Sequence, residues 1–222
     1  MAKSKECGQG QAERLKLALA ALERAYPDAA PQLVFSSPFE LLIATMLSAQ
    51  CTDKQVNRCT APLFETYKDA QSFLTLSEEA LIRYIHACGF FNTKAKNILS
   101  TCALLVSEYG GEVPQERELL MQLPGVGRKT ANVVLSNAFG VPAIAVDTHV
   151  FRVANRIGFA CAGDVFETEK QLMQNIPQVQ WSQAHHWLIF HGRQVCTARK
   201  PRCESCTVRE YCAQYIEENK AG

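Results

Sequence analysis

The feature that most constrains the fold of this chain is a tight turn between two predicted helices. Residues 123–130 have the sequence Leu-Pro-Gly-Val-Gly-Arg-Lys-Thr. Gly125 and Gly127 stand where the backbone must turn sharply or approach another group, because glycine tolerates positive φ and has no Cβ. A helix that begins at Arg128 points unpaired N–H groups and its positive dipole end outward. The turn therefore predicts an anion site, and phosphate is the obvious anion.

Two residues near this turn suggest chemistry. Lys129, in the first turn of the helix, can bind a phosphate or act as a nucleophile. A free lysine is protonated below a pKa of about 10.4, and both the helix N-terminus and the Arg128 cation favour the neutral amine. Asp147 precedes another predicted helix, where it can serve as N-cap. The same carboxylate can also stabilise positive charge and assist proton transfer.

Four of the ten cysteines gather near the end of the chain with the spacing C-x6-C-x2-C-x5-C. Four thiolates in one short segment can hold a zinc ion or a [4Fe–4S] cluster, and the spacing does not decide between them. The basic segment between the first two, with Arg199, Lys200 and Arg202, is either a phosphate-contacting loop held at both ends or a solvated loop. The four are Cys196, Cys203, Cys206 and Cys212.

Composition narrows the remaining possibilities. A net charge of +1 over 222 residues means that any DNA-binding field must come from local clusters. No apolar run is long enough for a membrane span, and the N-terminus has no apolar signal core. Six further cysteines are scattered, mostly in helical patterns, and are predicted to be small core residues. We therefore expect a chain of a reducing, cytoplasmic compartment.

The hydrophobic pattern is helical almost throughout, without strand-like alternation or a solenoid repeat, so the predicted class is all-α. Ser37 is the expected N-cap of a helix with Pro38 at its first position and Glu40 closing a capping box. The helix that follows is apolar nearly all round and should be central. The expected helices cover 11–25, 38–48, 53–66, 78–87, 93–108, 114–122, 128–138, 148–156, 166–175 and 182–194.

The turn with Lys129, the segment around Asp147 and the cysteine spacing together resemble the endonuclease III family of helix-hairpin-helix DNA glycosylases. The resemblance implies two helical lobes. A six-helix barrel domain would cover 31–141, with the helix-hairpin-helix at about 114–138. An iron–sulfur domain would combine 1–30 with 142–222. It also favours a [4Fe–4S] cluster over zinc.

By the same resemblance, the chain is a base excision repair enzyme that removes oxidised pyrimidines from duplex DNA and cleaves abasic sites. Lys129 would form a Schiff base that leads to β-elimination, supported by Asp147. A flipped-out base leaves a gap, and Gln50 matches the residue that fills it. Phe90 replaces the family's usual leucine wedge, and an aromatic ring can still stack there, unless Phe90 is a core residue. The other expected DNA contacts are Gly125, Val126, Gly127, Arg128, Thr130, His149, Arg199 and Lys200.

Other interpretations stay open at this level. A monofunctional adenine-mismatch glycosylase shares the hairpin, aspartate and cluster, but typically lacks the lysine and carries an extra domain. A non-catalytic helix-hairpin-helix module would bind DNA without cutting it, and a zinc-stabilised structural protein would contain no iron. Lys94 and Lys96 are expected on the surface, as phosphate contacts or solvated side chains. His185, His186 and His191 are expected in packing or polar networks. The expected state is a monomer with no membrane partner.

Overall fold

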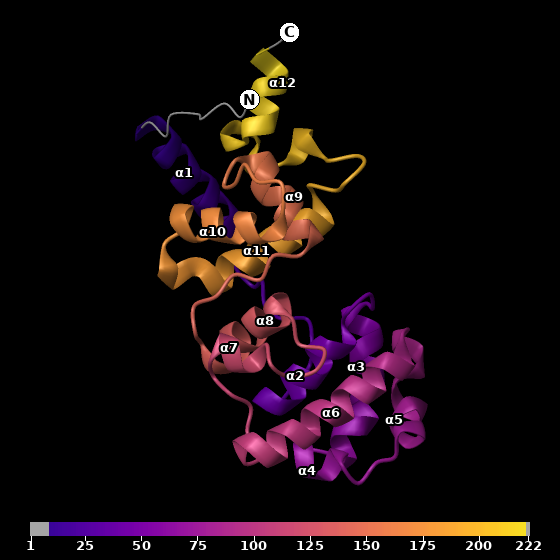
Figure 1. The fold of residues 1–222 in the computed structure, drawn as a ribbon. Coiled ribbons are helices and arrows are strands. Elements are labelled where there is room, and N and C mark those ends of the chain that lie inside the picture. The colour runs from indigo at the N-terminus through magenta and orange to yellow at the C-terminus, as the bar shows by residue number, and fades with distance from the viewer. Residues whose placement is uncertain (1–8, 221–222) are drawn as a thin grey trace. The chain divides into compact units, whose positions relative to one another are not determined.

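The computed structural model describes residues 9–220, and every regular element in that range is a helix (Figure 1). The predicted all-α class is confirmed. The chain divides into two compact units: Pro31–Ala143, and a second unit that joins Met1–Ala30 to Ile144–Gly222. Cys7 lies outside the described residues. No described helix is long and apolar enough to cross a bilayer.

The unit Pro31–Ala143 is built around one buried helix, α2. All residues from Phe39 to Leu47 are buried, and α2 contacts α3, α6 and α8, so its predicted central place is confirmed. The elements of this unit are α2 (Pro38–Leu47), α3 (Asp53–Thr66), α4 (Ala70–Phe73), α5 (Glu78–Ile85), the 3-10 helix η1 (His86–Cys88), α6 (Phe91–Tyr109), α7 (Arg117–Leu120) and α8 (Arg128–Phe139).

The start of α2 differs in one detail from the expected capping box. The Ser37 hydroxyl accepts a hydrogen bond from the Glu40 N–H at 3.2 Å, as predicted. The Glu40 carboxylate, however, accepts from the backbone N–H of Ser36 at 2.6 Å and from its hydroxyl at 2.7 Å. The reciprocal half of the box is therefore wrong. Ser36 offers the carboxylate two donors, whereas the Ser37 backbone offers one.

The longest helix, α6, supports much of this unit. It packs against α2, α4, α5 and η1 and ends at Gly110, whose φ of 61° gives the left-handed cap that glycine allows. The helix expected over 114–122 is too long, because only Arg117–Leu120 is helical. After Leu120 the hydrogen bonds tighten, from the Gln122 N–H to the Leu119 carbonyl and from the Leu123 N–H to the Leu120 carbonyl, and Pro124 disfavours helical backbone at Leu123, so the helix does not continue to 122.

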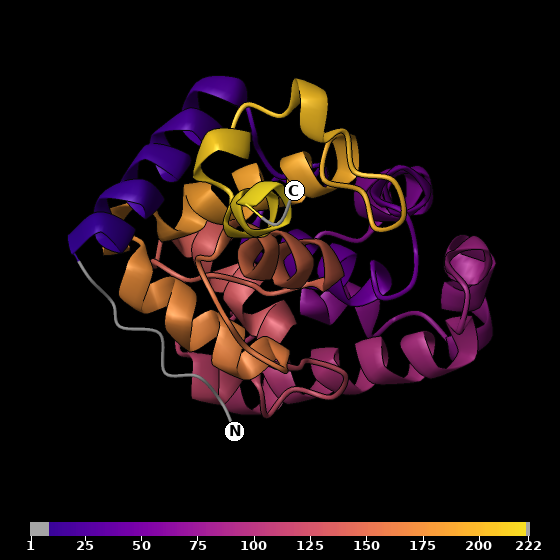
Figure 2. The same ribbon diagram turned by 90° about the horizontal axis from the view of Figure 1, so that it is seen from above.

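The second unit packs the N-terminal helix of the described chain against elements from its C-terminal part. The N-terminal helix α1 packs against α11 and η4 (Figure 2), and α9 contacts α10, α11 and α12. Gly192 permits the close approach of α9 and α11, since a Cβ there would lie 3.0 Å from His149 Cβ and 3.1 Å from Val153 Cγ2. The elements are α1 (Gln9–Ala25), α9 (Thr148–Ile157), α10 (Val165–Asn175), η2 (Gln178–Gln180), α11 (Trp181–Gln194), η3 (Cys203–Ser205), η4 (Arg209–Tyr211) and α12 (Ala213–Lys220).

Candidate functional site

The turn before α8 rests directly on α6. Gly125 has a φ of +79°, and a Cβ there would lie 2.8 Å from the amide nitrogen of Asn97. The Thr101 hydroxyl donates a 2.9 Å hydrogen bond to the carbonyl of Pro124, and Val126 is buried beneath the turn. Gly125 is therefore required by both its backbone conformation and its contact with α6.

Gly127 has a different role in the same turn. Its φ is −94°, so any residue can adopt its backbone conformation. A Cβ at Gly127 would meet nothing within 4 Å. Gly127 is the N-cap of α8, and no side chain caps the helix start. The positive end of the α8 dipole thus has no side-chain cap and open space beside Gly127, as an anion site requires.

Lys129 is the second residue of α8 and is exposed. Its ammonium makes no hydrogen bond or ion pair with any described residue. Arg128 and Thr130, on either side, are half-buried. The Lys129 amine is consequently available to a ligand that approaches the start of α8.

Three of the predicted DNA-binding residues share one cavity. Gln50, Phe90 and Gly125 line a space of about 270 Å³ together with Lys94 and Asn97. Gln50 (φ 53°) and Phe90 (φ 48°) are the two non-glycine residues with positive φ in the described chain. Such conformations are strained and are often found at functional sites. The alternative that Phe90 belongs to the core is wrong, because its side chain is 67% exposed.

Lys94 holds the two strained loops, and the expectation that it lies on the surface is wrong. It is 7% exposed, and its ammonium donates to the carbonyls of Leu47, Ala49 and Cys88, each at 2.8 Å. Burial lowers the pKa of Lys94, while Cys88 and Cys51 raise it. No sequence signal distinguishes it from Lys96, which is exposed on the same helix.

In the second unit, Asp147 has one carboxylate oxygen engaged and one available. Its Oδ1 accepts from the backbone N–H groups of His149 and Val150, both at 2.8 Å, so Asp147 is the N-cap of α9. Among the described residues, Oδ2 has no hydrogen-bond donor. Capping and a chemical role are thus compatible, because each can use a different oxygen.

Arg152 connects this aspartate-bearing helix to the cysteine segment. Its side chain lies 3.2 Å from His149 Nδ1 and donates to the carbonyls of Gly192 at 2.9 Å and Cys196 at 3.1 Å. His149 is therefore held by its own helix, and the first cysteine of the segment is fixed to α9.

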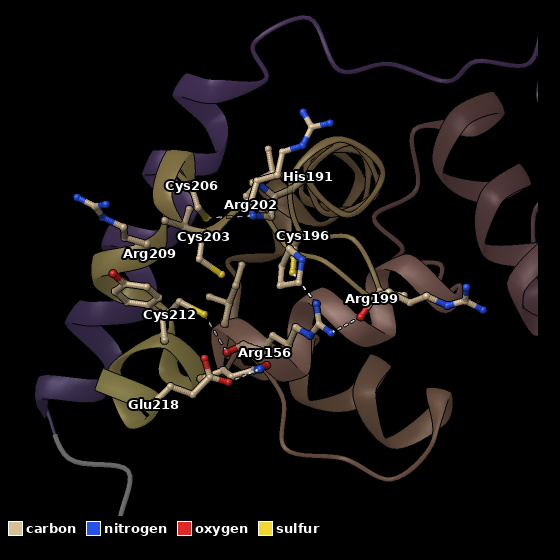
Figure 3. Close-up of a pocket in the computed structure, with 17 residues that line it drawn as sticks. Arg156, His191, Cys196, Arg199, Arg202, Cys203, Cys206, Arg209, Cys212 and Glu218 are labelled. Atoms are coloured by element: carbon tan, nitrogen blue, oxygen red, sulfur yellow. Dashed lines mark hydrogen bonds between the residues drawn. The ribbon is translucent and has the colours of Figure 1, made fainter. Parts of the chain in front are cut away.

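The four clustered cysteines surround one cavity of about 290 Å³ (Figure 3). Burial raises the pKa of Cys206 to about 11 and also raises those of Cys203 and Cys212. Sulfur donors of this kind suit iron or zinc as thiolates. No three His, Cys, Asp or Glu side chains among residues 9–220 are gathered closely enough to hold a single ion. Four sulfurs spread around a cavity of this size fit a polynuclear iron–sulfur cluster better than one zinc ion.

Two side chains, those of His191 and Arg156, form hydrogen bonds with these sulfurs. His191 Nε2 lies 3.5 Å from Cys206 Sγ, and its Nδ1 is hydrogen bonded to the Tyr26 hydroxyl at 3.0 Å. Burial lowers the pKa of His191 to about 4, so the ring is neutral at pH 7. Arg156 Nη1 donates to Cys196 Sγ at 3.5 Å (Figure 3). The expected polar-network role of His191 is thus observed. His185 and His186 are also buried in α11.

The basic loop between the first two cysteines is held by hydrogen bonds from α9 and by one within the loop. Arg156 donates to the carbonyls of Thr197 at 2.8 Å and Ala198 at 2.9 Å, and the Thr197 hydroxyl donates to the Lys200 carbonyl at 2.7 Å. Arg199 and Lys200 are exposed. Three cations on a fixed loop, the third being Arg202, lose little conformational entropy when they bind an anion.

Comparison with known proteins identifies what these sites belong to. Residues 43–178 match the family model of the HhH-GPD superfamily of base excision DNA repair proteins, and residues 196–212 match the iron–sulfur binding domain of endonuclease III. Endonuclease III of Escherichia coli (strain K12) is 50% identical over 208 residues, 94% of this chain and 98% of the relative. That of Bacillus subtilis (strain 168) is 50% identical over 198 residues, 89% and 90% of the two chains.

A solved structure agrees with these sequence matches. A trapped endonuclease III–DNA covalent intermediate superposes with a TM-score of 0.88 at 48% identity, covering 94% of this chain and 98% of the other. The class defined by fold and site is a DNA-binding enzyme of base excision repair, a DNA glycosylase/lyase with an iron–sulfur domain. The chain belongs to the endonuclease III family. The interpretations as a non-catalytic module and as a zinc protein are therefore wrong.

The two hairpin glycines give a matched pair of substitutions. Gly125→Ala should lower the free energy of unfolding by about 2–4 kcal/mol, because it combines a positive φ with a contact against Asn97. Gly127→Ala should lower it by less than about 1 kcal/mol yet weaken DNA binding, because its methyl group enters the open space at the start of α8. Urea unfolding and binding to a duplex with a tetrahydrofuran abasic analogue measure both effects. Equal stability of the two variants would contradict the assigned roles.

The cysteine assignment has an equally direct test. Cys203→Ser should lose iron and the visible absorbance of the cluster, because one of four sulfur ligands is gone. Cys161→Ser is the control, since Cys161 is exposed and lies outside the cavity. Iron analysis of the purified variants decides the matter, and full iron content in Cys203→Ser would rule out this ligand set.

Proposed function

We propose that this chain removes oxidised pyrimidines from duplex DNA and also cleaves the resulting abasic site through a lysine Schiff base. The observation that carries the proposal is the free amine of Lys129 at the uncapped start of α8. The chain is 48% identical to an endonuclease III that was trapped in a covalent intermediate with DNA. An exposed, unpaired amine beside a phosphate-binding turn is the group that such chemistry needs.

Lys129 performs the covalent step in this proposal. Its neutral amine attacks C1′ of the damaged nucleotide, and the base leaves with the electron pair of the glycosidic bond. The sugar ring opens to give an iminium ion on Nζ. Loss of a proton from C2′ then breaks the C3′–O bond, so the strand is cut 3′ to the lesion. The phosphates bind the uncapped N–H groups of α8 and hold the nucleotide in place.

Asp147 supports this step with the oxygen that capping leaves free. A carboxylate near the sugar stabilises the positive charge that develops as the glycosidic bond breaks. It can also accept a proton from the attacking amine. The hydrogen bonds from His149 and Val150 fix the other oxygen, so the carboxylate needs no reorganisation during the reaction.

Gln50 and Phe90 give access to the base. A base inside a duplex must be flipped out before it can react, and unstacking costs a few kcal/mol. Both side chains project from strained loops onto one cavity. We assign Gln50 to fill the vacated space and Phe90 to wedge between the neighbouring base pairs. Further contacts are assigned to Val126, Arg128, Thr130 and His149.

Cys196, Cys203, Cys206 and Cys212 would hold a [4Fe–4S] cluster, which supplies structural support when bound. When bound, it would hold the two ends of the loop that presents Arg199 and Lys200 to phosphates. In this proposal 31–141 is the six-helix barrel domain, and 1–30 with 142–222 forms the iron–sulfur domain. An enzyme of genomic DNA works where the DNA is, which for this proposal is the cytoplasm and its nucleoid. We propose that it acts as a monomer.

Borohydride trapping tests the nucleophile. Wild-type protein should form a covalent adduct with a duplex that contains one thymine glycol, because borohydride reduces the iminium ion to a stable amine. Lys129→Gln should form none. Lys96→Gln, which removes a charge from an exposed position in the same unit, should trap normally. An adduct with Lys129→Gln would place the nucleophile elsewhere.

The same assay distinguishes the bifunctional enzyme proposed here from a monofunctional adenine-mismatch glycosylase. Iron-loaded wild type that trapped neither thymine glycol nor abasic DNA, but released adenine from a mismatch, would establish a monofunctional enzyme. Release of thymine glycol with trapping supports the bifunctional proposal.

Asp147→Asn separates capping from chemistry. Asparagine is as good an N-cap as aspartate, so unfolding free energy should change little. Single-turnover base release should nevertheless slow by about 10²-fold or more, because the negative charge is lost. Asp164→Asn is the control, since Asp164 caps α10 in the same way through the Glu167 N–H at 2.9 Å. An unchanged rate in Asp147→Asn would leave Asp147 with capping alone.

A further inference from the structure

The side chain of His191 joins two distant parts of the second unit. Its Nε2 lies 3.5 Å from Cys206 Sγ, a contact drawn in Figure 3. Its Nδ1 lies 3.0 Å from the hydroxyl oxygen of Tyr26, and the two rings pack edge to face with centroids 5.9 Å apart. His191 is only 1% exposed. Both ring nitrogens therefore have protein partners, and the ring is shielded from water.

The backbone fixes both His191 and Tyr26 in place. The His191 carbonyl accepts a 2.8 Å hydrogen bond from the N–H of Cys196, so His191 contacts Cys196 through its main chain and Cys206 through its side chain. Tyr26 directly follows α1, and its N–H donates to the Leu22 carbonyl at 3.0 Å. Because α1 packs against α11, the N-terminal helix brings the Tyr26 hydroxyl to the histidine that contacts the cysteine segment.

The partners of the ring determine which nitrogen carries the proton. A cysteine that ligates iron is a thiolate and can only accept a hydrogen bond. Nε2 of His191 must then carry the proton, because a neutral imidazole has one N–H donor and burial disfavours the charged ring. Nδ1 is left as an acceptor. The Tyr26 hydroxyl, which has no other hydrogen-bond partner among residues 9–220, donates to it.

We propose that His191 is a positioning residue for the iron–sulfur cluster: its Nε2 donates a hydrogen bond to the Cys206 thiolate, and the Tyr26 hydroxyl holds the ring in the tautomer that this requires. The inference rests on the ligand set proposed above. A donor on a ligating sulfur fixes the orientation of that ligand, as the outer partners of metal ligands do. It also withdraws electron density from the sulfur, which favours the reduced cluster and raises its reduction potential.

Hydrogen bonding to sulfur explains the contacts of His191 better than ligation of iron by its ring. Four cysteines already supply the ligands of a cluster, and the match to the iron–sulfur domain begins at Cys196, after His191. Cys206 Sγ lies at hydrogen-bond distance from Nε2. The nitrogen that would have to ligate iron is therefore the one that already faces a sulfur ligand.

Iron release and reduction potential together test the inference on purified, iron-loaded protein. His191→Leu removes both hydrogen bonds, and Tyr26→Phe removes only the hydroxyl that sets the tautomer. A chelator should take iron from His191→Leu about tenfold faster than from wild type. The one-electron reduction potential of the cluster, measured at an electrode, should be lower in both variants and lowest in His191→Leu. His191→Gln, whose side-chain amide again offers an N–H donor, should recover most of the wild-type potential.

Two further variants serve as matched controls. Tyr215→Phe removes a hydroxyl from a residue that lines the cysteine cavity and whose side chain has no hydrogen-bond partner among the described residues. His186→Leu removes another buried histidine of α11 that does not line this cavity. Both should keep the wild-type potential. Tyr26→Phe keeps both aromatic rings, so it decides the question even if His191→Leu does not fold.

Each other result has a defined meaning. Wild-type potential in both Tyr26→Phe and His191→Leu would overturn the inference, and wild-type potential in Tyr26→Phe alone would overturn the role of the hydroxyl. A lower potential in His191→Leu that His191→Gln does not recover would reduce His191 to packing. Loss of iron from His191→Leu together with full iron in Cys206→Ser would make His191 a ligand and overturn the hydrogen bond. Wild-type protein purified without iron would instead contradict the proposed ligand set.

Discussion

The arrangement of the loops in the unit Pro31–Ala143 depends on the hydrogen bonds that the Lys94 ammonium donates. An ammonium group taken out of water costs several kcal/mol unless its protons are bound. Here the carbonyls of Leu47, Ala49 and Cys88 accept them. The Leu47 carbonyl lies at the end of α2, the Ala49 carbonyl in the loop that follows it, and the Cys88 carbonyl at the end of η1. The charge thus converts two loops into one rigid support, with Gln50 and Phe90 beside it.

The strain in these loops has a use. A non-glycine residue in the left-handed region costs about 1–3 kcal/mol and persists only where the surroundings fix it. Gln50 and Phe90 both adopt it, and both side chains are exposed. Because the two loops are already ordered before DNA binds, the conformational entropy is lost on folding and not on binding.

The second unit also presents a fixed loop, but arginine side chains of α9 hold it. Its basic loop has few apolar residues that could pack against the core, so hydrogen bonds hold the loop in place. Arg156 binds two loop carbonyls and the sulfur of Cys196, and Arg152 binds the Cys196 carbonyl. Both arginines come from α9, and Asp147 caps the same helix. One helix therefore positions both the cysteine segment and the proposed catalytic carboxylate.

Local sequence signals predicted much of this correctly. Gly125 has the positive φ that its place in the turn suggested, Ser37 and Asp147 are N-caps, and α2 is buried along its length. Each of these depends on residues within a few positions of one another, so the chain segment carries enough information. The failures concern side chains with several partners in reach. Glu40 bonds Ser36 instead of the Ser37 backbone, because Ser36 offers two donors. Lys94 is buried instead of exposed, because the fold brings carbonyls from the end of α2 and from η1 to its ammonium.

The sequence by itself determined the helical class, the hairpin turn and the cysteine segment, since glycine conformation, helix periodicity and ligand spacing are local properties. Only the tertiary structure decided that Lys94 is buried while Lys96 is not, and that Asn97 and Thr101 support the hairpin. These facts require segments far apart along the chain to meet. The free energy of such contacts depends on burial and on the partners available, and neither is encoded in any one segment.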